Sequence, residues 1–204
     1  MGSAGPGGAN GPGVSGLGEL SAGGSQAIVI SSDTLVDEDN DTAQDLYLRS
    51  GSTTTLLTGG TQNLDAKFIG LSTDATRITF YTDEALLPGD TDTQRDIYQW
   101  SGGALTLLST TATGGNGSFQ TNGAVSPDGT TAYLTTADPL LPADTDAEQD
   151  VYVRSGGTTS LASTGPTGVT AACPGCSGST AAATSWAPRP RTTPSASTSP
   201  TTSD

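Results

Sequence analysis

The stretch 140–157, LLPADTDAEQDVYVRSGG, decides the fold because the chain contains it in three versions. Closely similar sequences occupy residues 86–103, LLPGDTDTQRDIYQWSGG, and residues 35–52, LVDEDNDTAQDLYLRSGS. The single tyrosine of each stretch recurs at intervals of 51 and 54 residues. A repeat of this length indicates an array of similar supersecondary units, each of which packs against its neighbours.

Each repeat contains four short apolar stretches, which we interpret as antiparallel strands joined by turns. The second stretch is rich in β-branched and aromatic residues, as strands are. No segment keeps an apolar period of 3.6 residues over three turns, so we predict no helix. The predicted strands are 18–21, 27–31, 46–49 and 54–57 in the first repeat, 69–72, 77–82, 97–100 and 105–108 in the second, and 124–126, 131–136, 151–154 and 159–162 in the third.

The third repeat resembles the repeat of TolB-like, WD-repeat-like bacterial β-propellers. Those blades carry a Ser-x-Asp-Gly turn, an apolar strand and an Asp-aliphatic-Tyr strand, which match SPDGTTAYL at 126–134 and DVYV at 150–153. The first repeat departs from the pattern with Gly23-Gly24 in place of Asp-Gly, and the second with Asp74-Ala75.

The resemblance covers about residues 16–165. It implies an all-β fold of three consecutive four-stranded antiparallel blades. The blades are expected at 16–60, 67–111 and 121–165. Three blades cannot close the usual ring of four to eight. We therefore predict an incomplete ring whose outer blades expose apolar faces, which further blades or self-association would cover.

Both ends of the chain differ in composition from the repeats. Residues 1–15 are rich in Gly, and we interpret them as a flexible linker or as part of a preceding blade. Residues 166–204 are rich in Ser, Thr and Pro, and we expect a disordered tail, with a frameshifted reading of a further blade as the alternative that DNA sequencing would test. Cys173 and Cys176 lie in this tail without the further Cys or His that a zinc site needs.

Composition narrows the class of protein. Apolar residues make up 32% of the chain, which is low for a globular domain and fits many short strands and turns. The net charge is −14, whereas binding to nucleic acid through phosphate contacts needs a basic surface, so we predict no nucleic-acid partner. No apolar run approaches the ~20 residues that span a bilayer, and we see no signal peptide.

Sixteen of the 21 acidic residues lie in the loops between the second and third predicted strands. Up-and-down connectivity places these three loops on one rim of the blade array. Each loop carries the motif Asp-x-Asp-x-x-x-Asp. The nine motif residues are our candidate metal ligands: Asp39, Asp41, Asp45, Asp90, Asp92, Asp96, Asp144, Asp146 and Asp150.

Two interpretations of these nine aspartates are open. Ca²⁺ prefers several oxygen ligands from a short flexible loop, and a bound cation would relieve the repulsion between the carboxylates. The first loop nevertheless departs from an EF-hand that starts at Asp37, because position six is Thr42 and position twelve is Leu48. The residue types favour a structural role, in which the first aspartate of each motif caps a turn and the third anchors the following strand.

The repeats predict a binding module and no enzyme. The chain has no His, which excludes a Ser-His-Asp triad within it, and no glycine pattern marks a nucleotide site. We predict a non-catalytic scaffold, without a cofactor, that binds protein, glycan or envelope material. The alternatives are a fragment of a propeller-containing hydrolase or lyase whose catalytic residues lie outside this chain, and a calcium-binding repeat protein. The resemblance implies a location in the bacterial envelope or outside the cell.

Overall fold

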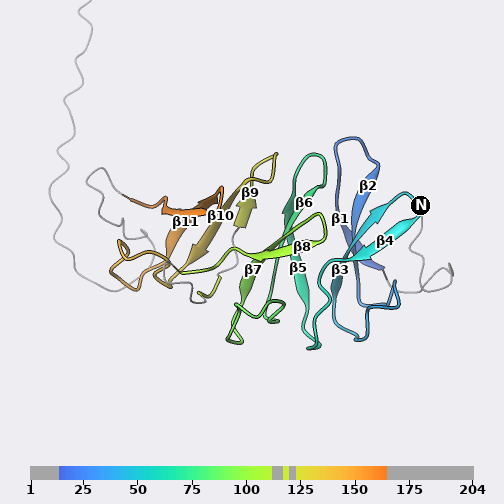
Figure 1. Ribbon diagram of the computed structural model, residues 1–204, viewed down its shortest axis with the longest axis horizontal. Helices are drawn as coiled ribbons and strands as arrows, with labels where there is room; N and C mark the ends of the chain where they lie inside the picture. The colour runs from blue at the N-terminus through green and yellow to red at the C-terminus, as the bar shows by residue number, and fades with distance from the viewer. Residues whose placement is uncertain (1–13, 112–116, 120–122, 165–204) are drawn as a thin grey trace, which may run out of the picture. The chain divides into compact units, whose positions relative to one another are not determined.

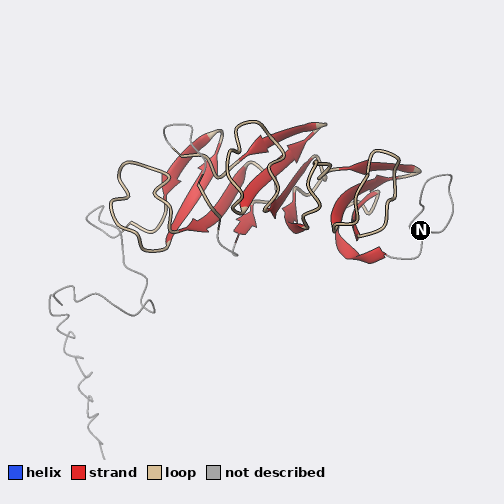
Figure 2. Ribbon diagram, turned by 90° about the horizontal axis from the view of Figure 1, so that it is seen from below, coloured by secondary structure: helices blue, strands red, loops and turns tan. Residues whose placement is uncertain are grey.

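The computed structural model describes residues 14–111, 117–119 and 123–164, and every regular element within them is a β-strand (Figure 1 and Figure 2). The first sheet contains β1 (Val14–Leu20), β2 (Gln26–Ser31), β3 (Asp45–Ser50) and β4 (Thr53–Leu56). The second contains β5 (Ala66–Leu71), β6 (Arg77–Thr82), β7 (Asp96–Ser101) and β8 (Ala104–Leu107). The third contains β9 (Gly123–Val125), β10 (Thr131–Thr136), β11 (Asp150–Ser155) and β12 (Thr158–Leu161).

Each sheet is an antiparallel meander in which strands that follow one another in the chain are neighbours. This is the connectivity of a propeller blade, and we call the sheets blade 1, blade 2 and blade 3 in chain order. The predicted all-β fold of three consecutive four-stranded blades is confirmed. Within the described part of the chain, one apolar cluster joins blades 1 and 2 and another joins blades 2 and 3, but none joins blade 1 to blade 3, so the array is open.

The strand limits agree best with the prediction in the second strand of blades 2 and 3, where β6 and β10 cover the predicted residues. The largest difference is β1, which begins at Val14, inside the segment that was predicted to precede the first blade. Register shifts interrupt its pairing with β2 between Val14 and Gly16 and between Leu17 and Leu20. Such irregularities remove the period-two pattern by which a strand is recognised in a sequence.

The two faces of a blade contact different neighbours, because alternate residues of a strand point to opposite sides. We call the face that is turned toward the preceding blade the leading face, and the opposite one the trailing face. The leading face of blade 2 carries Ile78 and Phe80, which lie in one apolar cluster with Ile28 and Leu46 of blade 1. The opposite, trailing face of blade 2 carries Ile97, which lies in a second cluster with residues of blade 3, namely Ala132, Leu134 and Tyr152. Leading face therefore meets trailing face at both junctions.

Backbone hydrogen bonds also join the blades. Between blades 1 and 2, the Ala22 N–H donates to the Thr73 carbonyl and the Ala66 N–H donates to the Gln44 carbonyl, both at 2.8 Å. The corresponding bonds between blades 2 and 3 run from Thr73 N–H to the Pro127 carbonyl and from Phe119 N–H to the Arg95 carbonyl, both at 2.6 Å. The same contacts at both junctions explain how a repeated sequence produces a repeated packing.

The turn between the first two strands keeps its conformation although its sequence varies. In blade 3, Gly129 has φ +67° and its N–H donates to the Ser126 carbonyl at 2.8 Å. In blade 2, Ala75 occupies the same place with φ 54°, and its N–H donates to the Ser72 carbonyl at 2.7 Å. An alanine in this left-handed region costs roughly 1–2 kcal/mol, so the surrounding turn must hold it there.

Several predictions from the sequence lie outside the described residues. These are the Gly-rich segment up to residue 13, the tail after residue 164, and Cys173 and Cys176. Among the residues that are described, none belongs to a helix of the length and apolarity needed to cross a membrane.

The packing at the second junction predicts a large effect on stability for one residue of β10 and a small effect for the residue beside it. Leu134 is fully buried in the cluster between blades 2 and 3, whereas Tyr133 points to the other side of the sheet and is 46% exposed. We expect Leu134→Ala to lower the free energy of unfolding by about 2–5 kcal/mol and Tyr133→Ala by about 0.5 kcal/mol or less. Urea denaturation of both variants tests this, and equal losses would contradict the assignment of faces.

Candidate functional site

The nine predicted aspartates come together in three clusters, one in the long loop between the second and third strands of each blade (Figure 1). In every cluster each aspartate offers one carboxylate oxygen, and these oxygens lie within 4.8 Å of one another. The first and third aspartates are buried, and the middle one is more exposed. The third is also the first residue of β3, β7 or β11.

The first aspartate of each motif accepts a hydrogen bond from the buried tyrosine eight residues later. In blade 3, the Tyr152 hydroxyl donates to Asp144 Oδ2 and accepts the Leu140 N–H at 3.1 Å. The loop itself is closed by a bond of 3.0 Å from the Asp144 N–H to the Leu141 carbonyl. The same hydroxyl–carboxylate bond joins Tyr47 to Asp39 and Tyr98 to Asp90.

The middle aspartate caps the second half of the loop. In blade 3, Asp146 Oδ1 accepts the Glu148 N–H at 3.0 Å. In blade 2, Asp92 Oδ1 accepts the Gln94 N–H at 2.7 Å. The equivalent bond in blade 1 runs from the Ala43 N–H to Asp41 Oδ1 at 2.8 Å. These bonds set the conformation of the loop by local side chain to backbone contacts.

The third aspartate connects the start of its strand to the residues that follow the fourth strand. In blade 1, the Thr58 hydroxyl donates to Asp45 Oδ1 at 2.6 Å and accepts the Leu46 N–H at 3.1 Å. Ser109 and Ser163 take the place of Thr58 in blades 2 and 3, where they donate to Asp96 and Asp150. One hydroxyl therefore links the first residue of one strand to the end of another.

Burial and mutual repulsion disfavour the charged form of the third aspartate. Burial raises the pKa of Asp45 from 3.8 to about 7; the charges of Asp39, Asp41 and Glu84 add to this, and the Thr58 hydroxyl opposes it. Burial, together with the charges of Asp144 and Asp146, also raises the pKa of Asp150. Burial and the neighbouring carboxylate raise the pKa of all three tyrosines, which therefore stay neutral hydrogen-bond donors.

Sequence reasoning did not find the hydroxyl partners Thr58, Ser109 and Ser163. Each follows its aspartate by 13 residues, so a search for residue types that recur at a constant offset could have found them. The three tyrosines that mark the repeat in the sequence are fully buried. Trp100 is partly buried against the cluster between blades 1 and 2.

Neither a protein-family model nor a curated protein matches the sequence. Among solved structures, TolB from Acinetobacter baumannii is similar over 75% of this chain, with 18% identity and a TM-score of 0.44. A structure from a study of two prolyl endopeptidases is similar over 73% of the chain, with 15% identity and a TM-score of 0.47. The matched parts cover 33% and 22% of those two proteins, so the chain spans about a third and about a fifth of their lengths.

The raised pKa of Asp45 predicts how stability depends on pH. In the unfolded chain the carboxyl loses its proton near pH 3.8, whereas in the folded chain it keeps the proton up to about pH 7. Ionisation of Asp45 therefore favours the unfolded chain, and its contribution to stability falls as the pH rises from about 4 to about 7. We expect Asp45→Asn, which stays neutral, to gain stability relative to the wild type over this interval, measured by urea denaturation in EDTA.

Asp74→Asn is the matched control for this experiment. Hydrogen bonds from Ser72 and Thr76 lower the pKa of Asp74 to about 2, so its contribution to stability is lost only as the pH falls below about 4. The difference between this variant and the wild type should stay constant from pH 4 to pH 7. A constant difference for Asp45→Asn as well would contradict the raised pKa of Asp45.

Proposed function

We propose that this chain is a non-catalytic propeller repeat module that acts as a protein-binding scaffold, and that its open blade faces are the binding surfaces. The observation that carries the proposal is the difference between equivalent residues in the three blades. The leading face of blade 1 corresponds residue by residue to the faces that are buried in blades 2 and 3, but the described residues provide no blade to cover it.

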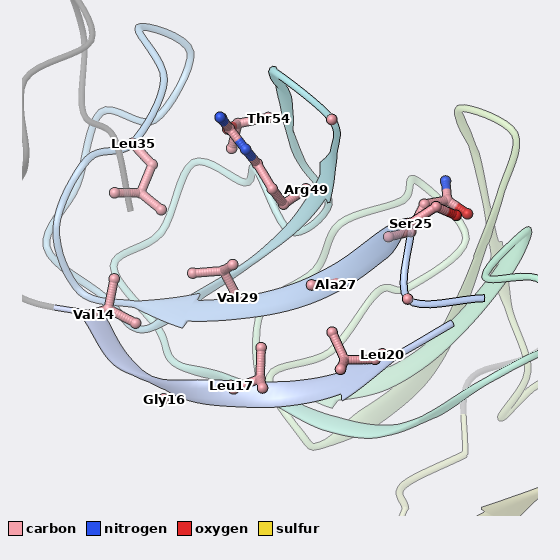
Figure 3. A pocket seen from close by; sticks show the side chains of 13 residues that line it. Val14, Gly16, Leu17, Leu20, Ser25, Ala27, Val29, Leu35, Arg49 and Thr54 are labelled. Carbon is pink, nitrogen blue, oxygen red and sulfur yellow. The ribbon is translucent and has the colours of Figure 1, made fainter. Parts of the chain in front are cut away.

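The leading face of blade 1 is apolar and exposed. Leu17 and Leu20 of β1 are 60% and 50% exposed, whereas Leu71, the residue of blade 2 that corresponds to Leu20, is buried. Val29 is only partly buried, whereas its equivalent in blade 2, Phe80, is fully buried. Figure 3 shows Leu17, Leu20 and Val29 around one hollow, with a volume of about 490 Å³. An exposed patch of this kind is typical of an interaction surface.

The trailing face of blade 3 is the second open surface. Tyr133, Val151 and Val153 lie on it, and each is at least partly exposed. Their equivalents on blade 1, Ile28, Leu46 and Leu48, are buried against blade 2. Among the described residues, the open face of blade 3 is therefore of the kind that packs, at both internal junctions, against a face like the open one of blade 1.

A polar contact shows the same difference between a covered face and an open one. Arg154 of blade 3 donates from Nη1 to the Thr110 hydroxyl of blade 2 at 3.2 Å and so crosses the junction. Arg49 corresponds to Arg154 and lines the hollow on blade 1, where its Nη1 donates to Thr54 of the same blade. The equivalent of Thr110 in blade 3 is Thr164, which is exposed. A second copy would thus offer Arg49 the partner that Arg154 has.

These correspondences support a second copy of the chain as the binding partner of the open leading face of blade 1. That copy would bind through the trailing face of its blade 3. The contact would be head-to-tail, because it joins two different surfaces. The acidic clusters support a structural role on the rim rather than a catalytic one, since their carboxylates are hydrogen-bonded to the tyrosine, serine or threonine side chains and the backbone of their own blade.

Light scattering after size-exclusion chromatography, over a range of protein concentrations, tests the proposal. We expect concentration-dependent self-association of the wild type, and its loss in Leu17→Glu and in Tyr133→Glu, because each variant places a charge in the apolar contact. Both residues are well exposed in the single chain, so neither change removes buried packing. A mixture of the two variants should associate again, since one retains an intact trailing face and the other an intact leading face.

Leu64→Glu is the control, because Leu64 is 38% exposed and lies between β4 and β5, away from both end faces. This variant should associate like the wild type. A wild-type chain that stays monomeric at all concentrations, or variants at positions 17 and 133 that associate normally, would contradict the proposal.

A further inference from the structure

The acidic cluster of blade 3 contains a buried carboxylate oxygen without a hydrogen-bond partner. Asp150 is 1% exposed, and its Oδ1 accepts the Ser163 hydroxyl. Its Oδ2 is buried and has no hydrogen-bond partner. A buried acceptor that is left unsatisfied destabilises the folded chain, and more so when it is charged, so such an atom needs an explanation.

Asp150 belongs to a cluster of three carboxylates that is small enough to hold one cation. One oxygen each from Asp144, Asp146 and Asp150 lies within 4.8 Å of the others. Asp144 accepts the Tyr152 hydroxyl at Oδ2 and the Asp146 N–H at Oδ1, and Asp146 Oδ1 accepts the Glu148 N–H. An ionised carboxylate has about four acceptor sites, so an oxygen that accepts one hydrogen bond can still bind a cation.

We propose that Asp144, Asp146 and Asp150 bind one Ca²⁺ ion, with Asp150 Oδ2 as the buried ligand. Three carboxylates supply up to six oxygens, and Ca²⁺ takes six to eight in flexible geometry, with water completing the shell. The limit of 4.8 Å on the separations fits within the diameter of a Ca²⁺ coordination shell, about 5 Å. Mg²⁺ requires shorter, near-octahedral contacts and suits this loop less well.

The charge of the cluster favours the same ligand. Three carboxylates whose oxygens lie within 4.8 Å of one another repel each other when they are ionised. A divalent cation would offset this repulsion and keep all three carboxylates ionised. Turn capping and cation binding are therefore compatible, because the capping bonds position the oxygens that the ion would use.

Isothermal titration calorimetry of the chelator-treated chain with CaCl₂ tests the proposal. We expect saturable Ca²⁺ binding and a weakening of at least about tenfold in Asp150→Asn, since even the loss of an outer-shell partner costs 10–100-fold. A thermal melt should show stabilisation by CaCl₂ beyond that of NaCl at matched ionic strength, and EDTA should remove it.

Two further variants make the result decisive. Asp128→Asn changes an exposed aspartate of the same blade outside the cluster and should bind Ca²⁺ like the wild type. Asp146→Asn affects the most exposed member of the cluster, so it tests the site even if Asp150→Asn does not fold. Wild-type affinity in both cluster variants, equal effects of CaCl₂ and NaCl, or equal affinity for Mg²⁺ would overturn the assignment.

Discussion

The hydrogen bond between a buried tyrosine hydroxyl and the first aspartate of the acidic loop is the interaction on which each blade depends. In blade 3 the bond joins Tyr152, on the third strand, to Asp144, on the loop that precedes it. Because the same hydroxyl accepts the Leu140 N–H, it also satisfies the backbone near the start of the loop. A buried carboxylate is stable only with such partners, so the position of the loop and the position of the strand determine each other.

Because the blades repeat, each of them has the same two kinds of face. Inside the chain, the trailing face of one blade packs against the leading face of the next, with Phe80 and Leu134 at equivalent places in the two junctions. The same surfaces occur on blades 1 and 3, where Leu17 and Tyr133 are exposed. In an array of this kind stability depends largely on the contacts between neighbours, and among the described residues blades 1 and 3 each have a neighbouring blade on one face only. The binding surfaces that we propose are therefore a direct result of the repeat.

Aspartates of the same chain experience opposite environments. The exposed Asp74 and Asp128 accept hydrogen bonds from hydroxyl and N–H groups of their own turns, which lower the pKa of each to about 2. Asp45 and Asp150 are buried among other carboxylates, and this raises the pKa of each. The sensitivity of this protein to pH and to cations should therefore be concentrated in the long acidic loops, whose charges the capping bonds hold close together.

The sequence by itself determined the fold class and the composition of the acidic clusters. The period of 51 and 54 residues indicated three similar units, and the apolar patterns of 77–82 and 131–136 gave the limits of β6 and β10. The three aspartates of each motif are close in sequence, so a single loop brings them together. These features depend on local order along the chain, which a sequence contains directly.

The number of repeats predicted open faces on the outer blades, but only the tertiary structure decided which residues lie on those faces and which oxygens are satisfied. Asp150 and Ser163 are 13 residues apart and meet because β11 and β12 pair in one register, and Asp150 Oδ2 is left without a hydrogen-bond partner in that arrangement. The early start of β1 depends on its irregular pairing with β2, which leaves no period-two pattern. Leu20 is exposed and its equivalent Leu71 is buried because a neighbouring blade covers Leu71 alone, and the two residues look alike in the sequence.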